Sequence, residues 1–497
     1  MKQLIHKGIL IPTYESKGFS IIVRGKKVRL NPKQEEIAVA WVKKQGTVYV
    51  EDNLFVENFF KDFSNALGPS ADYKREDIDF SEIQKAVDEE KAKKLNMPKE
   101  EKKKLAADRK AKREKNKEDY GYATLDGNKV ELGNYVGEPS SIFMGRGEHP
   151  LRGRWKEGPS QEDVTLNLSP DATRPEGSWK ETVWQSDSMW IAKWDDKLSH
   201  KVKYIWLADT VSVKQEREKR KFDLANKLET RFGKLKDHIE KNLVSGDAMR
   251  RKVATVCYLI NELKIRVGDE KAKDEADTVG ATTLRPEHVK IIDNTHVNFD
   301  FLGKDSVRWV RNVELKEQVV SNIREFIAAA TSPIFEGVKS DNVRRFLSDV
   351  LPGLTAKVFR TFHGSRIVRK YLDESAVTKD DAPIKKKYEA TTANLRAAEE
   401  LNHKRQLPKN WDQSLAKKKE TLNALRQKDD ERSKKHAREL DLKIDLMTKT
   451  CNYNLRTSLK SYIDPRIYYN WGKKVDYDWK LYYPKTFQRK FSWVEKS

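Results

Sequence analysis

The architecture of the chain follows from five short segments: LKIRVGDE at 263–270, FDFLGKDSVRW at 299–309, LTAKVFRTF at 354–362, LNHKR at 401–405 and SYIDPRI at 461–467. Each has an ordinary explanation when taken alone. An isolated arginine on a helix is usually a surface ion-pair partner, and a tyrosine before Asp-Pro usually packs in a turn. A histidine such as His403 is more often a cap or core residue, and Gly303 with Lys304 is typical of a plain hairpin turn. Because all five occur in one chain, we interpret them together as parts of one site.

The residues around the first segment predict a mainly helical domain. Its buried face, at helical spacing, consists of Val253, Val256, Cys257, Ile260 and Leu263. The residues that precede this face are charged but also helical in composition. We therefore place the start of a mainly helical domain near residue 213.

Residues 407–450 are rich in Lys, Glu, Asp and Leu and predict a helical hairpin with a thin apolar seam. The seam consists of Leu415, Leu422, Leu425, Leu440 and Ile444. From Cys451 onward, basic and aromatic side chains alternate. Such Trp and Tyr residues are usually packing anchors, so we expect a small, separately packed C-terminal domain.

The N-terminal part predicts a mixed α/β region. Residues 8–30 alternate apolar and polar side chains around Gly and Pro, which indicates short strands and turns. Asn31 and Pro32 then indicate the start of a helix. Further strand candidates are ETVWQ at 181–185, SMWIAKW at 188–194 and VKYIWLA at 202–208.

Charge points to a polyanionic partner. The 497 residues include 99 Lys and Arg against 77 Asp and Glu, a net charge of +22. Nucleic acid is the simplest partner for such a chain. Residues 82–118, mostly Lys, Glu, Asp, Ala and Arg, predict a solvated charged helix or arm, with a basic contact to DNA as the alternative.

Two classes of protein fit the sequence poorly. No apolar stretch approaches the roughly 20 residues that span a bilayer, and no signal peptide follows Met1, so we expect a soluble, intracellular protein without membrane contact. Cys257 and Cys451 lie far apart, and the nine histidines show no ligand spacing. We therefore expect neither a disulfide framework nor a metal site.

In order and spacing, the five segments resemble the active-site segments of eukaryotic-type DNA topoisomerase IB. Three upstream segments, VENFFKDF, FMGRGEHP and EADTVGATTLRPEHV, also resemble that family's core, so the resemblance covers nearly the whole chain. It implies an α+β multidomain fold that forms a bilobed DNA clamp. The expected parts are an N-terminal mixed α/β cap (1–212), a mainly helical catalytic domain (213–405), a helical linker (406–450) and a small C-terminal domain (451–497).

The resemblance assigns Tyr462 as the nucleophile that forms a 3′-phosphotyrosine and frees a 5′-hydroxyl. Arg266, Arg360 and His403 match the donors to the non-bridging phosphate oxygens. Lys304 matches the general acid that protonates the leaving 5′-oxygen.

This chemistry needs no energy source, because a tyrosyl phosphodiester is close in free energy to the bond that was cleaved. The sequence contains no GxxxxGK[ST] phosphate-binding loop, and we expect neither ATP, nor a metal, nor another cofactor. A free tyrosine has a pKa of about 10, so the site must favour the phenolate. Protein cations are expected to replace the magnesium of other phosphoryl-transfer enzymes.

Other matched positions concern the grip on duplex DNA, the expected partner. Arg146 resembles the family residue that enters the minor groove, although its neighbouring glycines also fit a simple loop. Asp305 and Thr457 match polar contacts near the cleavage site, and Thr278 matches a backbone contact. Lys357 stands three residues before Arg360, as it does in these topoisomerases.

Three features depart from the family pattern. Asp269 replaces the asparagine after Arg-x-Gly, and Ser461 replaces the asparagine before the tyrosine, a residue that contacts the drug camptothecin in the family. The chain also starts almost at the core, and its linker looks short. We therefore favour an archaeal or viral member, chromosome-associated in the cytoplasm or nucleoid, over a nuclear one.

Two rivals remain. Tyrosine recombinases use the same strand chemistry but need four protomers and carry His-x-x-Arg at the second arginine, whereas this chain has Lys357 there and is expected to act as a monomer. A non-enzymatic DNA-packaging protein would account for the charge alone. It leaves the five-segment pattern unexplained.

Overall fold

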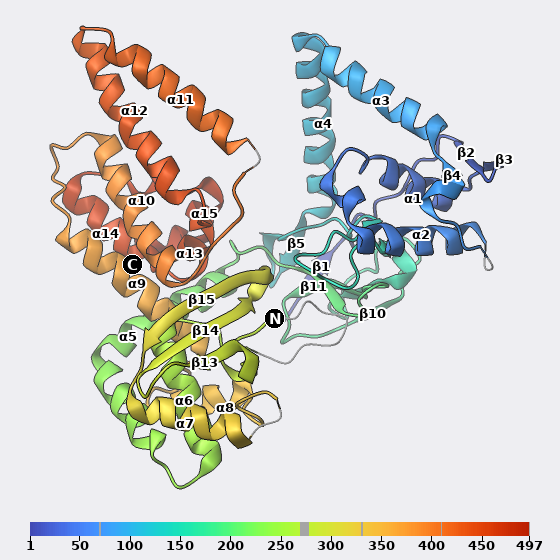
Figure 1. Ribbon diagram of the computed structural model, residues 1–497. Coiled ribbons are helices and arrows are strands. Elements are labelled where there is room, and N and C mark those ends of the chain that lie inside the picture. The colour runs from blue at the N-terminus through green and yellow to red at the C-terminus, as the bar shows by residue number, and fades with distance from the viewer. Residues whose placement is uncertain (69–70, 269–277, 330–331, 409, 497) are drawn as a thin grey trace. The chain divides into compact units, whose positions relative to one another are not determined.

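The computed structural model describes the chain except residues 69–70, 269–277, 330–331, 409 and 497; the side chain of Asp305 also lies outside the described part. Two compact units follow each other along the chain (Figure 1). Unit 1 comprises Met1–Val211, and unit 2 begins at Ser212.

Unit 1 is built from short strands arranged in small sheets. The strands are β1 (Leu4–His6), β2 (Ser20–Val23), β3 (Lys26–Arg29), β4 (Ile78–Asp79), β5 (Tyr122–Leu125), β6 (Asn128–Glu131), β7 (Ser141–Ile142), β8 (Trp155–Lys156), β9 (Thr165–Asn167), β10 (Glu181–Val183), β11 (Trp190–Asp195) and β12 (Val202–Trp206). They pair in the orders β1-β5-β6, β3-β2-β4, β7-β8 and β10-β9-β11-β12. The three strands predicted between residues 181 and 208 are thereby confirmed as β10, β11 and β12.

Helices accompany these sheets: α1 (Pro32–Val42), α2 (Asn53–Leu67), α3 (Ser81–Asn96) and α4 (Lys99–Tyr120). The predicted start at Asn31 and Pro32 is confirmed. The side chain of Asn31 accepts a hydrogen bond from the backbone N–H of Gln34, whose side chain accepts one in return, so the two form a capping box. Trp41 stacks on Phe59, with ring centroids 4.5 Å apart, and joins α1 to α2 in the core.

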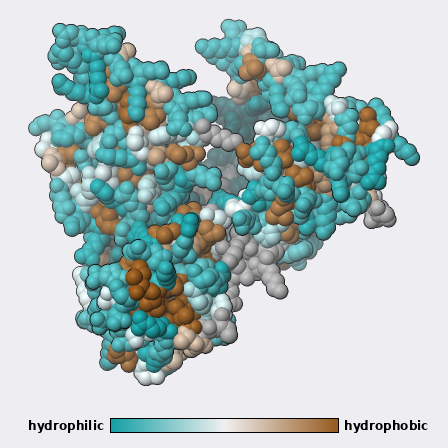
Figure 2. All heavy atoms as spheres, in the orientation of Figure 1, coloured by the Kyte–Doolittle hydropathy of each residue, from teal (hydrophilic) through white to brown (hydrophobic). Residues whose placement is uncertain are grey.

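The charged arm predicted at residues 82–118 forms the two helices α3 and α4. Only Ile83 and Val87 of α3 are buried, and no residue of α4 is. The prediction of a solvated helix is therefore confirmed for this arm. Figure 2 shows hydrophilic residues over most of its visible surface.

Unit 2 is mainly helical, as the pattern from residue 213 predicted. Its helices are α5 (Ser212–Leu243), α6 (Ala248–Leu263), α7 (Glu317–Ala329), α8 (Ser340–Ser348), α9 (Ala356–Glu374), α10 (Pro383–Glu400), α11 (Trp411–Arg426), α12 (Glu431–Thr450), α13 (Leu455–Ser461), α14 (Pro465–Val475) and α15 (Lys485–Lys490). An antiparallel sheet, ordered as written, consists of β13 (Val289–Ile291), β14 (His296–Gly303) and β15 (Val307–Glu314).

One large core joins helices α5 to α9 to this sheet. Helix α6 lies within it, because every residue from Val253 to Leu263 except Glu262 is buried. Both Phe299 on β14 and Phe359 on α9 are almost fully enclosed in the same core. The strands β14 and β15 and the helix α9, which carry two of the five segments, are thus packed into one core.

A second core holds the C-terminal residues. Tyr468, Trp471, Tyr483 and Trp493 are buried there with Val368 of α9. The aromatic residues that the sequence marked as packing anchors are confirmed in that role.

The predicted helical hairpin is also confirmed, as α11 and α12 (Figure 1). Its seam is thin: Leu422, Leu440 and Ile444 are buried, while Leu415 and Leu425 are partly buried. Tyr388 of α10 donates a hydrogen bond to Asp445 of α12 and so attaches the hairpin to the rest of unit 2. None of the described helices combines the length and apolar character needed to cross a membrane.

Candidate active site

Helix α9 supplies the arginine at the centre of the site. Thr355 caps this helix by accepting a hydrogen bond from the N–H of Val358. Arg360 follows in the second turn, is only 4% exposed, and donates through Nη2 to the carbonyl of Leu401 over 3.0 Å. Its guanidinium carbon lies 5.1 Å from the ring centroid of Tyr462. Burial lowers the pKa of Arg360 to about 10, which leaves the side chain cationic at neutral pH.

Arg266 is placed by a turn that follows α6. The helix ends at Leu263, and Lys264 adopts a left-handed conformation that redirects the chain. The carbonyl of Arg266 then accepts a hydrogen bond from the N–H of Ala281. Gly268 and Gly280 lie so close together that a Cβ on Gly280 would be 2.5 Å from the Cα of Gly268. Because both residues are glycine, the backbone segment that carries Arg266 can lie directly against the segment that contains Gly280.

Tyr462 follows the last residue of α13 and is 4% exposed. Its phenolic oxygen accepts a hydrogen bond from Nη1 of Arg266 over 3.1 Å. Burial alone would raise the pKa of Tyr462, but the charges of Arg360, Arg266 and Lys357 and the hydrogen bond from Arg266 outweigh it and lower the pKa. The site thus favours the phenolate, the form in which tyrosine is a nucleophile.

His403 faces the same tyrosine. The two ring centroids are 5.2 Å apart. The carbonyl of His403 accepts a hydrogen bond from the N–H of Asn454, so its loop is tied to the residues just before α13. Burial, reinforced by Arg360 and Arg266, lowers the pKa of His403 to about 3, and the imidazole is neutral at pH 7.

Several buried polar atoms at this place have no hydrogen-bond partner in the described part of the chain. Among the described residues, these include Nε of Arg360 and both ring nitrogens of His403. Leaving a buried polar group unpaired costs about 1–3 kcal/mol, so such groups are rare in native proteins and need an explanation. An anion bound between Arg360 and His403 would accept hydrogen bonds from Nε of Arg360 and from the one ring N–H that a neutral His403 carries.

Lys304 reaches this place from the sheet. It begins a short 3-10 turn (Lys304–Ser306) between β14 and β15, where Gly303 pairs with Val307. The hairpin turn that the sequence suggested is therefore present, and Lys304 is exposed on it. A pocket in unit 2 is lined by residues of four of the five segments, including Arg266, Lys304, Arg360 and His403.

The other predicted contact residues fall into two groups. Thr457 lines the same pocket, and Lys357 lies one turn before Arg360 on α9. Thr278 immediately precedes Val279, another lining residue. Arg146 lies in unit 1, exposed between Gly145 and Gly147, which both adopt positive φ angles.

Two positions singled out in the sequence are not described. Asp269 and the side chain of Asp305 lie outside the described part of the structure. The described residues contain no group of three or more His, Cys, Asp or Glu side chains that could hold a metal ion. The two cysteines are free, with Cys257 buried.

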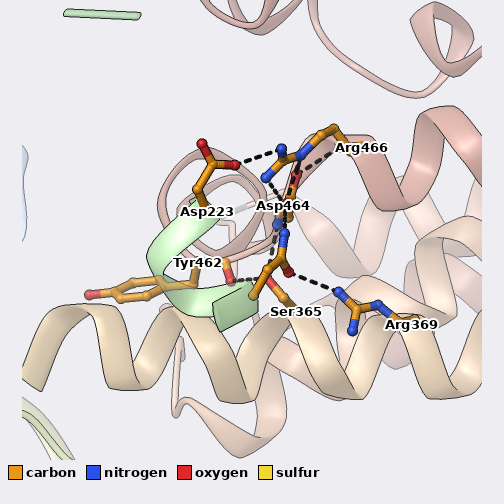
Figure 3. Close-up of polar contacts among 7 residues, drawn as sticks. Asp223, Ser365, Arg369, Tyr462, Asp464 and Arg466 are labelled. Atoms are coloured by element: carbon orange, nitrogen blue, oxygen red, sulfur yellow. Dashed lines mark hydrogen bonds and ion pairs between the residues drawn. The ribbon is translucent and has the colours of Figure 1, made fainter. Parts of the chain in front are cut away.

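The sequence analysis did not identify the residues that contact the backbone at and after Tyr462, on the side opposite its phenol. Figure 3 shows Tyr462 with its phenol directed away from a polar cluster that includes Asp464 and Arg466. Arg466 donates to Asp464 and, over 2.7 Å, to Asp223 of α5. Ser365 of α9 accepts from the N–H of Asp464. Asp464 and Arg466 stand in the segment SYIDPRI, but their contacts with Asp223 and Ser365 could not be predicted, because each partner resembles many other charged or small residues of the chain.

Gly364 is a further missed residue, and here a signal existed. A Cβ at this position would lie 2.8 Å from the carbonyl oxygen of Tyr462 and 3.1 Å from Leu401. Glycine inside a helix costs about 1 kcal/mol relative to alanine, which marks a place where another backbone comes close. The helix α9 can therefore lie directly against the chain that carries Tyr462.

Comparison with known families agrees with this geometry. The model of the eukaryotic DNA topoisomerase I catalytic core matches residues 210–437, that of the eukaryotic DNA topoisomerase I DNA-binding fragment matches residues 1–207, and that of the C-terminal topoisomerase domain matches residues 434–497. The chain is 32% identical to mitochondrial DNA topoisomerase I of Rattus norvegicus, over 99% of this chain and 91% of the relative. The chain belongs to the eukaryotic-type DNA topoisomerase IB family.

Other members of the family are similarly related. DNA topoisomerase 1 of Homo sapiens is 30% identical, over 99% of this chain and 70% of the relative. DNA topoisomerase 1 beta of Arabidopsis thaliana is 32% identical over 99% of this chain, but the chain spans only 58% of that relative's length. The similarity to these topoisomerases therefore extends over both units of the chain.

Proposed function

We propose that the protein is a type IB DNA topoisomerase that relaxes positive and negative supercoils by cutting and resealing one strand of duplex DNA. One observation carries this proposal: Arg266, Arg360 and His403 converge on Tyr462, although the four residues come from segments far apart in the chain. A buried tyrosine among cations, next to unpaired buried donors, suits attack on a phosphodiester.

In the cleavage step, the oxygen of Tyr462 attacks the phosphorus, and the bond to the 5′-oxygen breaks. Arg266 and Arg360 bind the non-bridging oxygens, where charge develops in the transition state. A neutral His403 donates one ring N–H to the same oxygens. The hydrogen bond from Arg266 to Tyr462 would loosen as the phenolate charge passes to the phosphate.

The leaving 5′-oxygen needs a proton, because an alkoxide is a poor leaving group. We assign this proton to Lys304, which is exposed on the turn between β14 and β15 and lines the pocket. The tyrosyl phosphodiester retains the free energy of the cleaved bond, so the 5′-hydroxyl can attack it and reseal the strand without ATP. Protein cations stand in this scheme where other phosphoryl-transfer enzymes use magnesium.

We further propose that the protein acts on the chromosome as a monomer. Its units 1 and 2 would together form a clamp on duplex DNA. Arg146 of unit 1 would enter the minor groove, while Lys357, Thr278, Asp305 and Thr457 of unit 2 would contact the DNA near the break. The broken end that Tyr462 does not hold would then swivel, driven by torsion in the DNA. The positive net charge of +22 favours such binding and makes it strongly dependent on salt.

A site-specific tyrosine recombinase is the nearest rival function. It shares the nucleophile but requires a tetramer and a defined target sequence. Lys357 before Arg360 and the three matched family models both favour the topoisomerase. A plasmid without any special site distinguishes the two functions.

The direct test is relaxation of a supercoiled plasmid in EDTA without ATP, by wild type and by Tyr462→Phe. Wild type should give relaxed topoisomers and a covalent adduct in which the protein is joined to the 3′ end of the broken strand. The Phe variant should give neither while binding duplex with nearly unchanged affinity, because only the nucleophilic oxygen is removed. Plasmid that stays supercoiled with wild type at every salt concentration would refute the proposal.

A further inference from the structure

The two carbonyl groups on either side of the Cα of Tyr462 are held by side chains from two different helices. The carbonyl of Ser461 accepts a hydrogen bond from Nζ of Lys221 on α5, over 3.0 Å. The carbonyl of Tyr462 accepts one from the hydroxyl of Ser365 on α9, over 3.3 Å. Figure 3 shows Ser365 beneath the tyrosine backbone, on the side away from the phenol.

Lys221 is not an ordinary surface lysine of a charged helix. Its side chain is only 11% exposed and pairs with Glu218 at 2.9 Å. Glu218 also lies 3.3 Å from Nζ of Lys490 on α15, whose side chain is 8% exposed. The ammonium of Lys221 further lies 4.1 Å from the ring centroid of Phe222. Burying a charge in this way is costly unless it is paired and hydrogen-bonded, and Lys221 has both kinds of contact.

We propose that Lys221 is a positioning residue for the nucleophile, which fixes the peptide group before Tyr462 through its contact with the carbonyl of Ser461. The proposal deepens the function given above and rests on it. The peptide plane before a residue and the carbonyl after it together set that residue's φ and ψ angles. Lys221 and Ser365 thus hold both ends of the backbone unit that aims the phenol of Tyr462 at the phosphate.

A small displacement of the attacking oxygen lowers the rate of such a reaction steeply. A misplacement of about 1 Å can cost on the order of 100-fold in rate. The backbone N–H of Tyr462 donates a hydrogen bond to the carbonyl of Ser458 over 2.8 Å. Hydrogen exchange at this N–H therefore measures how firmly the backbone at Tyr462 is fixed. Loss of Lys221 should make that hydrogen bond open more often.

The charge on Lys221 should make the hold sensitive to pH. Three charged groups act on Lys221: Glu218 on its own helix, Lys357 on α9 and Lys490 on α15, which also pairs with Glu218. Burial is the main cause that lowers the pKa of Lys221 to about 8; Lys357 and Lys490 lower it further, and Glu218 opposes them. As pH rises through this value, the charged contact with the carbonyl of Ser461 is lost.

The test compares Lys221→Met with Lys386→Met in the full-length protein. Lys386 is a matched control, since it is also a buried lysine of unit 2 and donates to two backbone carbonyls, those of Lys379 and Asp476, away from the tyrosine. Three quantities are measured: duplex affinity, the single-turnover rate of strand cleavage between pH 7 and 9.5, and hydrogen exchange in the peptide covering residues 459–466.

We expect Lys221→Met to slow cleavage at pH 7 at least 10-fold, with duplex affinity within twofold of wild type. The ratio of wild-type to variant rates should fall as pH rises past 8, because the Lys221 amine then loses its charge and donates a weaker hydrogen bond to the carbonyl of Ser461. Exchange in residues 459–466 should accelerate several-fold in this variant and not in Lys386→Met. A rate within twofold of wild type, or an equal loss in both variants, would overturn the inference.

Hydrogen exchange separates this inference from the proposed function. If wild type cleaves no DNA, the proposed function fails, yet faster exchange at residues 459–466 in Lys221→Met alone still supports the hold on the backbone. Unchanged exchange overturns the inference even if plasmid relaxation succeeds.

Discussion

Arg266 donates a hydrogen bond to the phenolic oxygen of Tyr462 over 3.1 Å, and the two residues lie 196 positions apart in the sequence. The contact ties the turn after α6 to the end of α13. It also gives the arginine two proposed duties: before cleavage it favours the phenolate, and during cleavage it can bind the phosphate. These two duties respond differently to pH, which makes them separable.

The first prediction concerns Arg266→Gln. The charge and hydrogen bond of Arg266 both lower the pKa of Tyr462, against burial, which raises it. Removing them should raise that pKa and move the rise of the cleavage rate to higher pH. We expect about a 100-fold loss at pH 7.5, typical of removing one donor to a developing charge, and a smaller loss at pH 9.5.

The measurement is the single-turnover cleavage rate from pH 6.5 to 9.5. Arg366→Gln serves as the control, because Arg366 is an arginine on the same helix α9 as Arg360 but pairs with Glu229 at 3.6 Å. It should leave the profile unshifted. If the loss in Arg266→Gln is the same at every pH, the arginine acts on the phosphate alone.

The second prediction uses the glycine that lies against Tyr462. Gly364→Ala would place a methyl group 2.8 Å from the carbonyl oxygen of Tyr462, closer than real Cβ contacts allow. Since backbone must move, we expect a loss of cleavage on the order of 100-fold and about 1–3 kcal/mol of destabilisation. Gly233 on α5 has nothing within 4 Å of the corresponding position. Gly233→Ala should stabilise the protein by up to about 1 kcal/mol and leave cleavage unchanged.

Both alanine variants are compared by urea unfolding and by cleavage rate. Normal cleavage in Gly364→Ala would show that α9 and the chain at Tyr462 can separate without harm. The close approach would then be irrelevant to the chemistry.

Periodicity was enough to predict several of the helices and strands. The spacing from Val253 to Leu263 predicted a buried helix, and the leucines of residues 407–450 predicted the hairpin α11–α12, because both patterns follow from burying one face of a helix. Residues 8–19 were predicted as strands and turns but contain little regular strand. There, Tyr14, Ser16 and the backbone of Lys17 instead bind the buried carboxylate of Glu35.

The candidate site was predictable only in part. Tyr462, Arg266, Arg360 and His403 stand in recognisable segments, and the structure brings them together. Lys221 could not be found in this way, because a lysine in a charged helix gives no sign of its burial or of the carbonyl it will meet. That information arises only when α5 packs against the end of α13.

The third prediction tests Lys304 as the general acid. Lys304→Ala should slow cleavage of an ordinary strand at least 100-fold, but far less when sulfur replaces the bridging 5′-oxygen, because a thiolate leaves without a proton. Lys290→Ala is the control, since Lys290 is an exposed lysine on β13 of the same sheet. Equal slowing on both substrates would make Lys304 an electrostatic or structural residue instead.

The last prediction concerns Ser461, where the family usually has an asparagine that contacts camptothecin, a drug that stacks in the nick and blocks religation. Ser461 is partly exposed at the end of α13, and its carbonyl, not its side chain, is bound by Lys221. Ser461→Asn should therefore leave the backbone hold and drug-free relaxation nearly unchanged. A serine hydroxyl is shorter than the amide and offers one donor where the amide offers two, so the polar contact to the drug is lost or made through water.

Losing one net hydrogen bond costs about 0.5–1.5 kcal/mol, which corresponds to an affinity loss of roughly two- to twelve-fold. We expect wild type to be poisoned weakly, and Ser461→Asn to need a lower drug dose by that factor. Arg146 and Asp305, which match the other drug contacts of the family, are retained in this chain. The measurement is the dose that gives half-maximal trapped covalent complex on one labelled duplex. Equal doses, or greater sensitivity of the serine form, would contradict the prediction that the asparagine strengthens drug binding at this position.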